Sequence, residues 1–407
     1  MTIKWLRLLD YWIGRALCTI VTGLLWIRRL FPTKGAELAH PRSILLIKLF
    51  GIGSIVLSLP AIQTLRQHHP QATLHFLTFR SNAQLLPLTG MVAPENMLTI
   101  DNSSAVRLLR SGLHALLQAR RLHLDAVVDL EFFSRFTALF GRMARPGALI
   151  GFHGFHTEGL KRGNLLDYSI HFNSTLHTSR VFMTLLQPFG IASESAPKAL
   201  PRLPPAPHFR ENIAEWLRQA GCQTPAMIRH WIAINPHCGD LVLLRKWPIT
   251  HFQRLLTLLL EGRADIGIVI IGSAHEYQAG ETLRQLFAST PLQERLFNLA
   301  GKTDVQGLID LFHWADCLIS NDSGPAHVAA LTGIPSIVLF GPESATLYRP
   351  LGAQVRALQL DLDCQPCLTI FNGKHSHCTD NRCLMELLPE VVAQEVWPIL
   401  AHKEHRA

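Results

Sequence analysis

Short apolar runs alternate with longer segments of helical periodicity along most of the chain, beginning at Ser43. This alternation is typical of parallel strands joined by crossover helices. In the first half it predicts strands at 44–49, 73–79, 126–130 and 148–151, with helices at 54–67 and 105–121. Pro60 falls inside the first of these helices and is expected to kink it.

A proline-rich segment at 196–208 interrupts the pattern and reads as a semi-rigid linker. Beyond it the alternation restarts, with strands expected at 231–235, 266–271, 317–320 and 336–340, and helices at 250–261, 279–288, 305–313 and 325–332. We therefore expect an N-terminal helix (1–40), an α/β domain (41–195), the linker, a second α/β domain (209–388) and a C-terminal helix and tail (389–407). Ligands of such sheets bind at the carboxyl ends of the strands, here in a cleft between the two domains.

The first thirty residues are apolar but carry arginines. The run at 16–27 ends in basic residues without a cleavage pattern, and Arg15 leaves it short of the ~20 apolar residues that span a bilayer. An in-plane amphipathic anchor, with Trp5, Trp12 and Trp26 at the headgroup level, fits this pattern. The alternative is a helix that packs on the protein's own surface.

The net charge of +8 over 407 residues is concentrated in the first half of the chain. Lys and Arg outnumber Asp and Glu by 20 to 10 through Glu194, but number 18 against 20 afterwards. This favours an anionic glycolipid or membrane surface as partner and argues against nucleic acid, since no basic run is interleaved with aromatics. The helix at 105–121 carries four arginines and no acid, and is either a solvated face or an acceptor-binding patch.

The strongest local motif is Ser-Asn-Asp-Ser-Gly-Pro-Ala-His at 320–327, between an apolar strand and an apolar-periodic helix. Ser323 or Asp322 can cap that helix, and Gly324 allows close approach of a ligand to the backbone. The helix start then offers free amides to an anion such as a diphosphate, with His327 within reach and Asn321 beside it. A capped helix with an incidental histidine is the alternative.

The segments 299–350 and 44–65 resemble glycosyltransferase family 9, which includes the ADP-heptose lipopolysaccharide heptosyltransferases. The resemblance extends over about 43–396. It implies a GT-B fold of two Rossmann-like domains, inversion at the anomeric carbon, no required metal or other cofactor, and a nucleotide sugar held mainly by the C-terminal domain.

Several positions match the family's motifs. Its donor-binding loop corresponds to Asp322, Ser323, Gly324 and His327, and the turn after the next strand to Gly341 and Pro342. Residues 245–248, Arg-Lys-Trp-Pro, resemble a Lys-x-Trp-Pro element whose lysine contacts donor phosphate. Arg245 keeps the charge and suits phosphate oxygens, and Lys246 could share the role.

One departure affects the expected base. The family's first glycine loop ends in Gly-Asp, and that aspartate is its presumed base, whereas this chain has Gly51, Gly53 and then Ser54. Ser54 suits a helix N-cap but takes no proton at neutral pH. Glu131, just past a predicted strand and flanked by aromatics, is the substitute we expect, with Arg135 to orient it or to bind acceptor phosphate.

Cys364, Cys367, Cys378 and Cys383 cluster with a spacing compatible with a structural zinc site, although the second pair is wide. In reducing cytosol a disulfide is less expected.

These observations predict an inverting, metal-independent glycosyltransferase at the cytoplasmic face of the inner membrane. It would move a sugar, with heptose as the family's default, from a nucleotide diphosphate to a lipopolysaccharide-like glycolipid. The alternatives are a nucleotide-sugar-binding protein that has lost turnover and a GT-B nucleotide-sugar epimerase.

Overall fold

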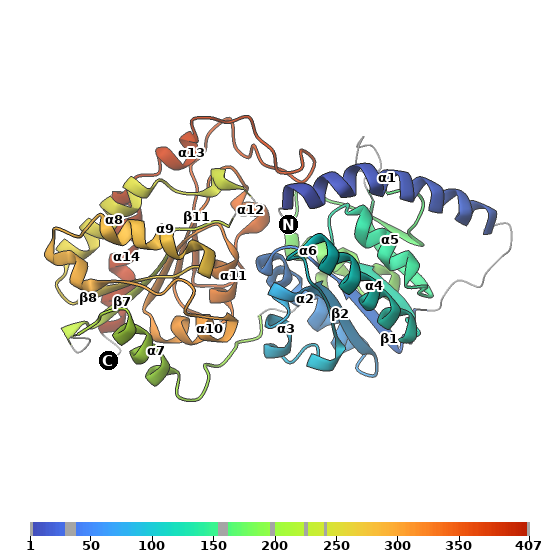
Figure 1. Cartoon of the computed structure of the whole chain (residues 1–407), viewed down its shortest axis with the longest axis horizontal. Coiled ribbons are helices and arrows are strands. Elements are labelled where there is room, and N and C mark those ends of the chain that lie inside the picture. Colours follow the sequence, from blue (N-terminus) through green and yellow to red (C-terminus); the bar gives the residue numbers. More distant parts are fainter. Residues whose placement is uncertain are drawn as a thin grey trace. The chain divides into compact units, whose positions relative to one another are not determined.

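The computed structural model describes residues 3–28, 38–153, 162–195, 200–223, 227–239 and 242–404. The chain divides into two compact units, an N-terminal unit (Met1–Lys198) and a C-terminal unit (Ala199–Ala407) (Figure 1). The division falls inside the proline-rich segment that the sequence identifies as a linker.

The N-terminal unit contains a parallel sheet of six strands in the order β3-β2-β1-β4-β5-β6. The strands are β1 (Ser43–Ile47), β2 (Thr73–Phe79), β3 (Met97–Ile100), β4 (Ala126–Asp129), β5 (Ala148–His153) and β6 (Tyr168–His171). The helices are α1 (Ile3–Arg28), α2 (Ile52–His68), α3 (Leu85–Leu88), α4 (Ala105–Arg121), α5 (Arg135–Met143) and α6 (Thr178–Thr184).

The C-terminal unit repeats this topology, with the strand order β9-β8-β7-β10-β11-β12. Its strands are β7 (His230–Asn235), β8 (Ile266–Ile270), β9 (Leu296–Asn298), β10 (Cys317–Asn321), β11 (Ser336–Leu339) and β12 (Val355–Leu358). Its helices are α7 (Phe209–Gln219), α8 (Ile249–Gly262), α9 (Tyr277–Gln285), α10 (Val305–Trp314), α11 (Gly324–Ala330), α12 (Ala345–Tyr348), α13 (Arg382–Met385) and α14 (Pro389–Glu404).

Numbered within its own unit, each sheet runs 3-2-1-4-5-6, the order of doubly wound nucleotide-binding folds. The expected α/β class with two Rossmann-like units is thus confirmed. In both sheets the strand order reverses between the first and fourth strands, at β1/β4 and β7/β10, and ligands of such folds bind beside that reversal.

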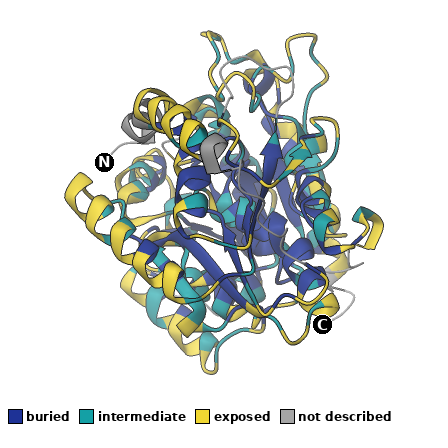
Figure 2. Cartoon of the chain, turned by 90° about the vertical axis from the view of Figure 1, so that its right-hand side faces the viewer, coloured by how far each residue is buried: buried dark blue, intermediate teal, exposed yellow. Residues whose placement is uncertain are grey.

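The central strands are apolar and buried because helices cover both faces of each sheet. Figure 2 shows the strands in the dark blue of buried residues, inside helices whose outer faces are exposed. The C-terminal core includes α14, where Val392, Val396 and Leu400 pack with α8. The predicted C-terminal helix is therefore part of the C-terminal unit's core.

Helix α1 packs on α5. Asp10 accepts hydrogen bonds from the backbone amide of Phe136 (2.7 Å) and the hydroxyl of Ser134 (3.2 Å), so it caps the start of α5. Cys18 is buried with Leu139, while the outer face exposes Trp12 (69%) and neighbouring apolar side chains. The helix is thus packed on its own unit and apolar outside; Trp5 and Trp26 lie outside the residues whose side chains are described.

Among the described helices, none is both long and apolar enough to cross a bilayer.

The second half of the predicted linker is attached to the C-terminal unit. The Leu203 amide donates to the carbonyl of Leu331 (2.9 Å), and the Ala206 amide donates to Asp310 (2.7 Å). From residue 200 on, this segment is part of the C-terminal unit rather than a spacer.

Candidate functional site

At the carboxyl edge of the C-terminal sheet, polar side chains from β7 and β10 meet at the strand-order reversal. Asn235 ends β7 and donates its amide to the hydroxyls of Ser323 (2.7 Å) and Ser320 (3.2 Å). Asn321 ends β10 and accepts the backbone amide of Trp247 (3.1 Å). This network is buried, and it fixes the 320–327 motif to both strands.

The motif turns into α11 as predicted, but its capping differs from the prediction. Ser323 occupies the N-cap position without a side-chain cap hydrogen bond, because its hydroxyl contacts Asn235 and Ser320 instead. Asp322 is turned to Arg245. His327 is in the first turn and 5% exposed. Neither predicted capping side chain therefore covers the backbone amides at this turn.

Next to Asp322, the structure gathers charges that are far apart in the sequence. Arg245 Nη1 lies 3.4 Å from Asp322 Oδ2 and 3.8 Å from Glu343 Oε1. The Lys374 ammonium pairs with Glu343 at 2.8 Å and lies over the Tyr348 ring. Burial alone would lower the pKa of Arg245, but the two carboxylates together raise it above its ordinary value. Arg245 is thus a permanent, partly neutralised cation.

Lys246 is the cation left over at this edge. Among the described residues Lys246 has no ion-pair partner. The pKa of His237 is lowered mainly because the ring is buried, and the charge of Lys246 lowers it further. His237, which follows β7, is neutral at neutral pH because its pKa is lowered. Its Nε2 has no hydrogen-bond partner among the described residues. A spare ammonium and an unpaired ring nitrogen here suit a polar, anionic ligand.

Gly341 and Pro342, the predicted turn after β11, connect this edge to the cysteine-bearing segment. A Cβ at Gly341 would lie 2.6 Å from the Leu384 side chain of α13, so any larger residue would have to displace that side chain. The carbonyl of Pro342 accepts the backbone amides of Cys367 and Leu368, both at 3.1 Å. In the described structure the turn thus anchors a neighbouring segment, and Glu343 directly after it enters the charge cluster.

The four cysteines do not form a ready metal site. Their exposure ranges from exposed Cys364 to buried Cys383, and the Cys378 thiol donates to Asp380 (3.3 Å). Burial raises the pKa of the Cys383 thiol to about 11, and the other three cysteines add to that rise. No group of three or more His, Cys, Asp or Glu in the described part of the chain is placed to hold a metal ion. The structural zinc site therefore stays a prediction.

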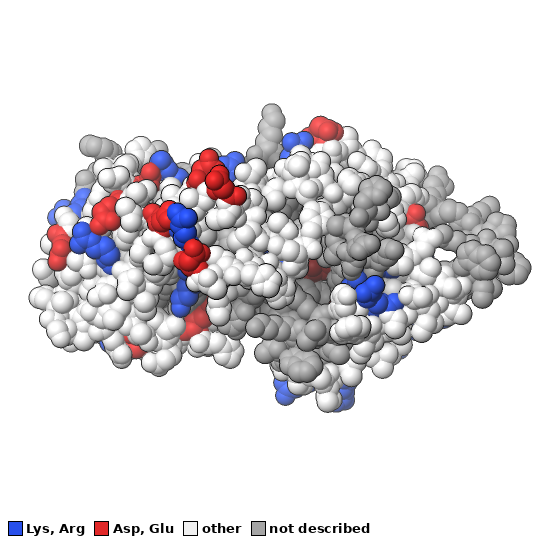
Figure 3. All heavy atoms as spheres, turned by 90° about the horizontal axis from the view of Figure 1, so that it is seen from above, with Lys and Arg blue, Asp and Glu red and all other residues white. Residues whose placement is uncertain are grey.

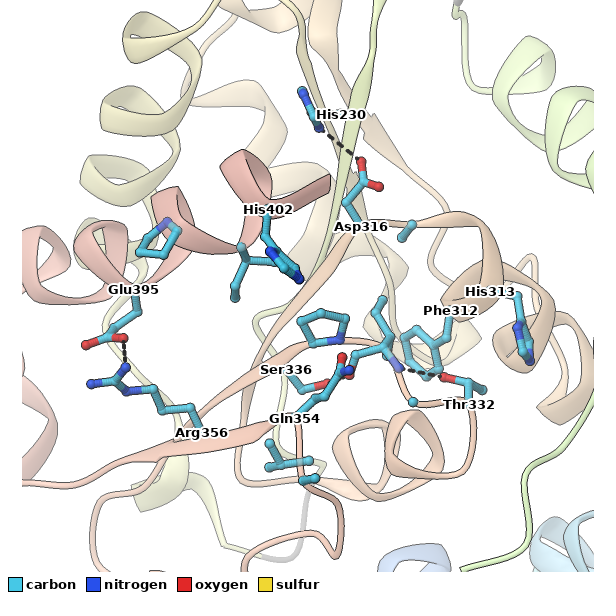
Figure 4. Close-up of a pocket in the computed structure, with 18 of the residues that line it drawn as sticks. His230, Phe312, His313, Asp316, Thr332, Ser336, Gln354, Arg356, Glu395 and His402 are labelled. Atoms are coloured by element: carbon cyan, nitrogen blue, oxygen red, sulfur yellow. Dashed lines mark hydrogen bonds and ion pairs between the residues drawn. The ribbon is translucent and has the colours of Figure 1, made fainter. Parts of the chain in front are cut away.

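A hollow of this unit with a volume of about 1440 Å³ lies at the opposite edge of the sheet. Figure 4 shows its polar side chains, among which His230 faces Asp316 and Arg356 pairs with Glu395. None of the predicted donor-binding residues lines it. His230–Asp316 and Arg356–Glu395 are paired inside this hollow, and the carboxyl edge carries the motif that matches the donor-binding loop.

In the N-terminal unit, Glu131 lies inside the strand-order reversal rather than at its surface. It is 6% exposed. Its Oε1 accepts the backbone amides of Leu49 (2.7 Å) and Phe50 (2.8 Å), and the Lys48 ammonium lies 2.8 Å away. Only Oε2 is left to take a proton. The carboxylate thus holds the chain that leads from β1 into the glycine loop.

A second buried pair stands behind Glu131. Asp129 is fully buried, pairs with the Arg162 guanidinium at 2.6 Å and accepts the Thr137 hydroxyl at 3.0 Å. Burial raises the pKa of Asp129 to about 6, against the opposing effect of Arg162. The backbone amide of Glu131 donates to Asp129 as well, so one carboxylate positions the other.

One prediction for the glycine loop needs correction. Helix α2 begins at Ile52 with Gly51 as its N-cap, at φ 79°, a left-handed conformation that favours glycine. Ser54 therefore lies in the first turn, one residue after Gly53, and is not the cap. Arg135, at the start of α5, is 5% exposed and pairs with Asp10 of α1 at 3.5 Å, and its role in binding acceptor phosphate stays a prediction.

Comparison with known proteins identifies the family of the chain. The model of glycosyltransferase family 9 (heptosyltransferase) matches residues 120–375, more than half of the chain. The chain belongs to glycosyltransferase family 9. Lipooligosaccharide heptosyltransferase 2 of Haemophilus influenzae is 34% identical over 117 residues, 28% of this chain and 33% of that protein. Lipopolysaccharide heptosyltransferase 1 of Campylobacter coli is 23% identical over 304 residues, 73% of this chain and 83% of that protein.

The solved structure of ADP-heptose lipopolysaccharide heptosyltransferase II from Escherichia coli has a TM-score of 0.67 at 22% identity, covering 89% of this chain and 99% of that one. A family 9 glycosyltransferase from Veillonella parvula gives 0.68 at 17%, covering 91% and 100%. These likenesses support the two-unit fold. The chain spans only a third to about half of the length of the first curated relatives it matches.

Several residues at the carboxyl edges of the two sheets, each described within its own unit, were not predicted as site residues. They are Lys48, Asp129, Arg162, His237, Glu343 and Lys374. Lys48 and Glu343 carried a usable signal, since each is a charged residue directly after a buried strand or the turn that follows it. Arg162 and Lys374 come from segments without periodicity, and no local pattern marks them.

Proposed function

We propose that this family 9 chain is an inverting glycosyltransferase that moves heptose from ADP-heptose to the core region of lipopolysaccharide or a similar glycolipid. The observation that carries the proposal is the cationic carboxyl edge of the C-terminal sheet, at the position where doubly wound folds bind nucleotides. The family supplies the class of sugar.

The donor diphosphate would occupy the edge formed by Arg245, Lys246 and the turn at 321–327. Arg245 is held in place by Asp322 and Glu343, so its position is set before the ligand arrives. Lys246 has no such partner among the described residues, and its ammonium can move to a phosphate oxygen. The uncovered amides at the turn add short-range donors.

In the reaction, an acceptor hydroxyl attacks the anomeric carbon from the face opposite the nucleotide. The new carbon–oxygen bond forms as the bond to the diphosphate breaks, through an oxocarbenium-like state. The departing diphosphate gains negative charge, which Arg245 and Lys246 stabilise. These side chains supply positive charge from the protein itself, in keeping with transfer that needs no added metal.

The hydroxyl proton must leave to a base, and Glu131 remains our candidate through its Oε2. The contacts of Oε1 favour an additional role for the same carboxylate, the positioning of the loop after β1. The two roles predict different behaviour of a Glu131→Gln variant, as developed below.

We also place the protein at the cytoplasmic face of the inner membrane, held there peripherally. Support comes from the apolar outer face of α1, where Trp12, Ile20 and Leu24 are 60–69% exposed. Aromatic and aliphatic side chains of this kind suit the interfacial region of a bilayer.

The test uses the purified full chain with ADP-heptose and a heptose-deficient lipopolysaccharide core. The expected result is ADP release together with a glycolipid heavier by one heptose. Both should form more slowly in Lys246→Ala but not in Arg218→Ala, where the replaced residue is an exposed cation on α7. Binding of ADP-heptose without release of ADP in the presence of any acceptor would favour a nucleotide-sugar-binding protein. A changed sugar that stays on the nucleotide without acceptor would show an epimerase.

A further inference from the structure

Helix α4 of the N-terminal unit exposes an apolar stripe that nothing in the described structure covers. Val106 and Leu109 are each 74% exposed, Leu113 is 59% exposed and Leu117 is 45% exposed. At 3.6 residues per turn these four positions fall on one face of the helix. Soluble surfaces carry single exposed aliphatic residues, but rarely four in a row along one helix.

The stripe is separate from the face that holds α4 on its sheet. Ala115, Leu116 and Ala119 are buried in the core that also contains Leu45 of β1 and Phe140 of α5. The buried face therefore attaches α4 to the core of the unit. The exposed stripe takes no part in that packing in the described structure. A helix with two apolar faces, one buried and one open, has a second surface to bind.

A basic edge runs beside the stripe. Arg110, Arg121 and His114 follow it on the helix wheel, and α4 contains no Asp or Glu. Arg107 pairs only loosely with Asp101, at 4.0 Å, and Arg110 and Arg121 have no acidic partner among the described residues. Figure 3 shows Lys, Arg, Asp and Glu interspersed on the C-terminal unit and few coloured side chains of either sign on the described part of the N-terminal unit in that view.

The open surface continues beyond α4. Arg120 Nε donates to the carbonyl of Met143 at the end of α5 (2.7 Å), and the Met143 side chain is 45% exposed. Figure 1 shows α4 and α5 on the same side of the sheet, with α1 next to α5. Apolar side chains of all three helices are thus exposed on one side of the N-terminal unit.

We propose that α4 is a membrane-docking helix, whose Val/Leu stripe inserts into the interface of a bilayer while its arginines bind anionic phospholipid headgroups. Aliphatic side chains flanked by arginine are the composition of helices that lie in the interfacial plane. A protein partner would be expected to bring acids for the arginines and an apolar groove for the stripe; a bilayer with anionic lipids offers both without a dedicated site. This docking does not depend on the transfer reaction proposed above.

The experiment measures binding of the full chain to vesicles that contain phosphatidylglycerol, compared with pure phosphatidylcholine vesicles. Leu109→Ser/Leu113→Ser and Arg110→Gln/Arg121→Gln are the test variants. Each arginine near an anionic surface is worth about fivefold in affinity, so the second variant is expected to bind about 25-fold more weakly. Leu286→Ser, an exposed leucine of the C-terminal unit, and Arg180→Gln, an exposed arginine of α6, are the matched controls and should bind as the unaltered chain does.

A photoactivatable phospholipid then locates the contact, since α1 is expected to bind lipid as well. We expect cross-links within 105–121 that are lost in the leucine variant, while ADP binding in solution stays unchanged. Unaltered vesicle binding in both variants, or cross-links confined to other segments, would overturn the proposal. So would a leucine variant that turns an oligomer into a monomer without lipid, because the stripe would then be a contact between copies.

Discussion

Replacing Glu131 by glutamine separates its two proposed roles. The substitution keeps an oxygen that can accept the amides of Leu49 and Phe50, but it removes the charge opposite Lys48, whose side chain is only 2% exposed. A buried ammonium without its partner costs about 3–5 kcal/mol. We expect this loss to fall on the β1–α2 loop, since Lys48, Leu49 and Phe50 all belong to it.

Hydrogen exchange read by mass spectrometry measures the loss of stability in the β1–α2 loop itself. Thermal unfolding of the whole protein does not isolate it, because the chain has two units. Peptides that cover 44–53 should exchange more than a hundredfold faster in Glu131→Gln, because every 1.4 kcal/mol is a factor of ten. Peptides covering β7 in the other unit should not change. Adding Lys48→Met to the variant removes the stranded charge and should restore protection to within about 1–2 kcal/mol.

Activity then completes the test. If Glu131 is also the base, transfer stays lost in the double variant even though its loop is restored. If it only positions the loop, the double variant recovers transfer with its pH profile intact. Unchanged exchange of the 44–53 peptides in Glu131→Gln would refute the reasoning from the Lys48 contact.

Three further outcomes are expected. Lys246→Ala should lower kcat/KM about 10- to 100-fold in a coupled ADP-release assay, since a hydrogen bond to a charged group is worth about 1.5–3 kcal/mol; equal rates for Lys246→Ala and Arg218→Ala would contradict this. The folded-state pKa of Asp129 is raised to about 6 from 3.8, so its contribution to stability is full below about pH 4 and is lost as the pH rises through 6. In urea titrations between pH 4 and 6, the free energy of unfolding should therefore decline less in Asp129→Asn than in the unaltered chain. An identical decline in the two proteins would count against the pKa shift. Deleting residues 1–32 should reduce sedimentation with membranes while leaving ADP binding intact, and undiminished sedimentation would remove α1 as an anchor.

The sequence predicted the central strands of both sheets within two residues, because each is a continuous apolar run that the packing buries on both faces. It missed β3, β6, β9 and β12, and these are the four edge strands. Edge strands are short and, in β6 and β12, half exposed, so they carry no apolar run to detect.

In the candidate site, too, the local motif was predicted and the contacts between distant parts of the chain were not. The 320–327 motif was found because a strand, a glycine turn and a helix start follow one another locally. Ser323 takes the N-cap position of α11 as predicted, but its hydroxyl makes no cap hydrogen bond because it accepts the amide of Asn235. Asn235 is distant in the chain and adjacent only through the pairing of β7 with β10. The loop contacts of Glu131 were missed for the same reason, since its contact with the loop after β1 depends on the pairing of β1 with β4.

Hydrogen exchange with and without ADP tests the central claim most directly. If a diphosphate binds at the carboxyl edge of the C-terminal sheet, ADP should slow exchange in the peptides that cover 243–247 and 321–327, and Lys246→Ala should weaken the effect. Protection of peptides around His230, Arg356 and His402 instead, at the opposite edge of the same sheet, would contradict it.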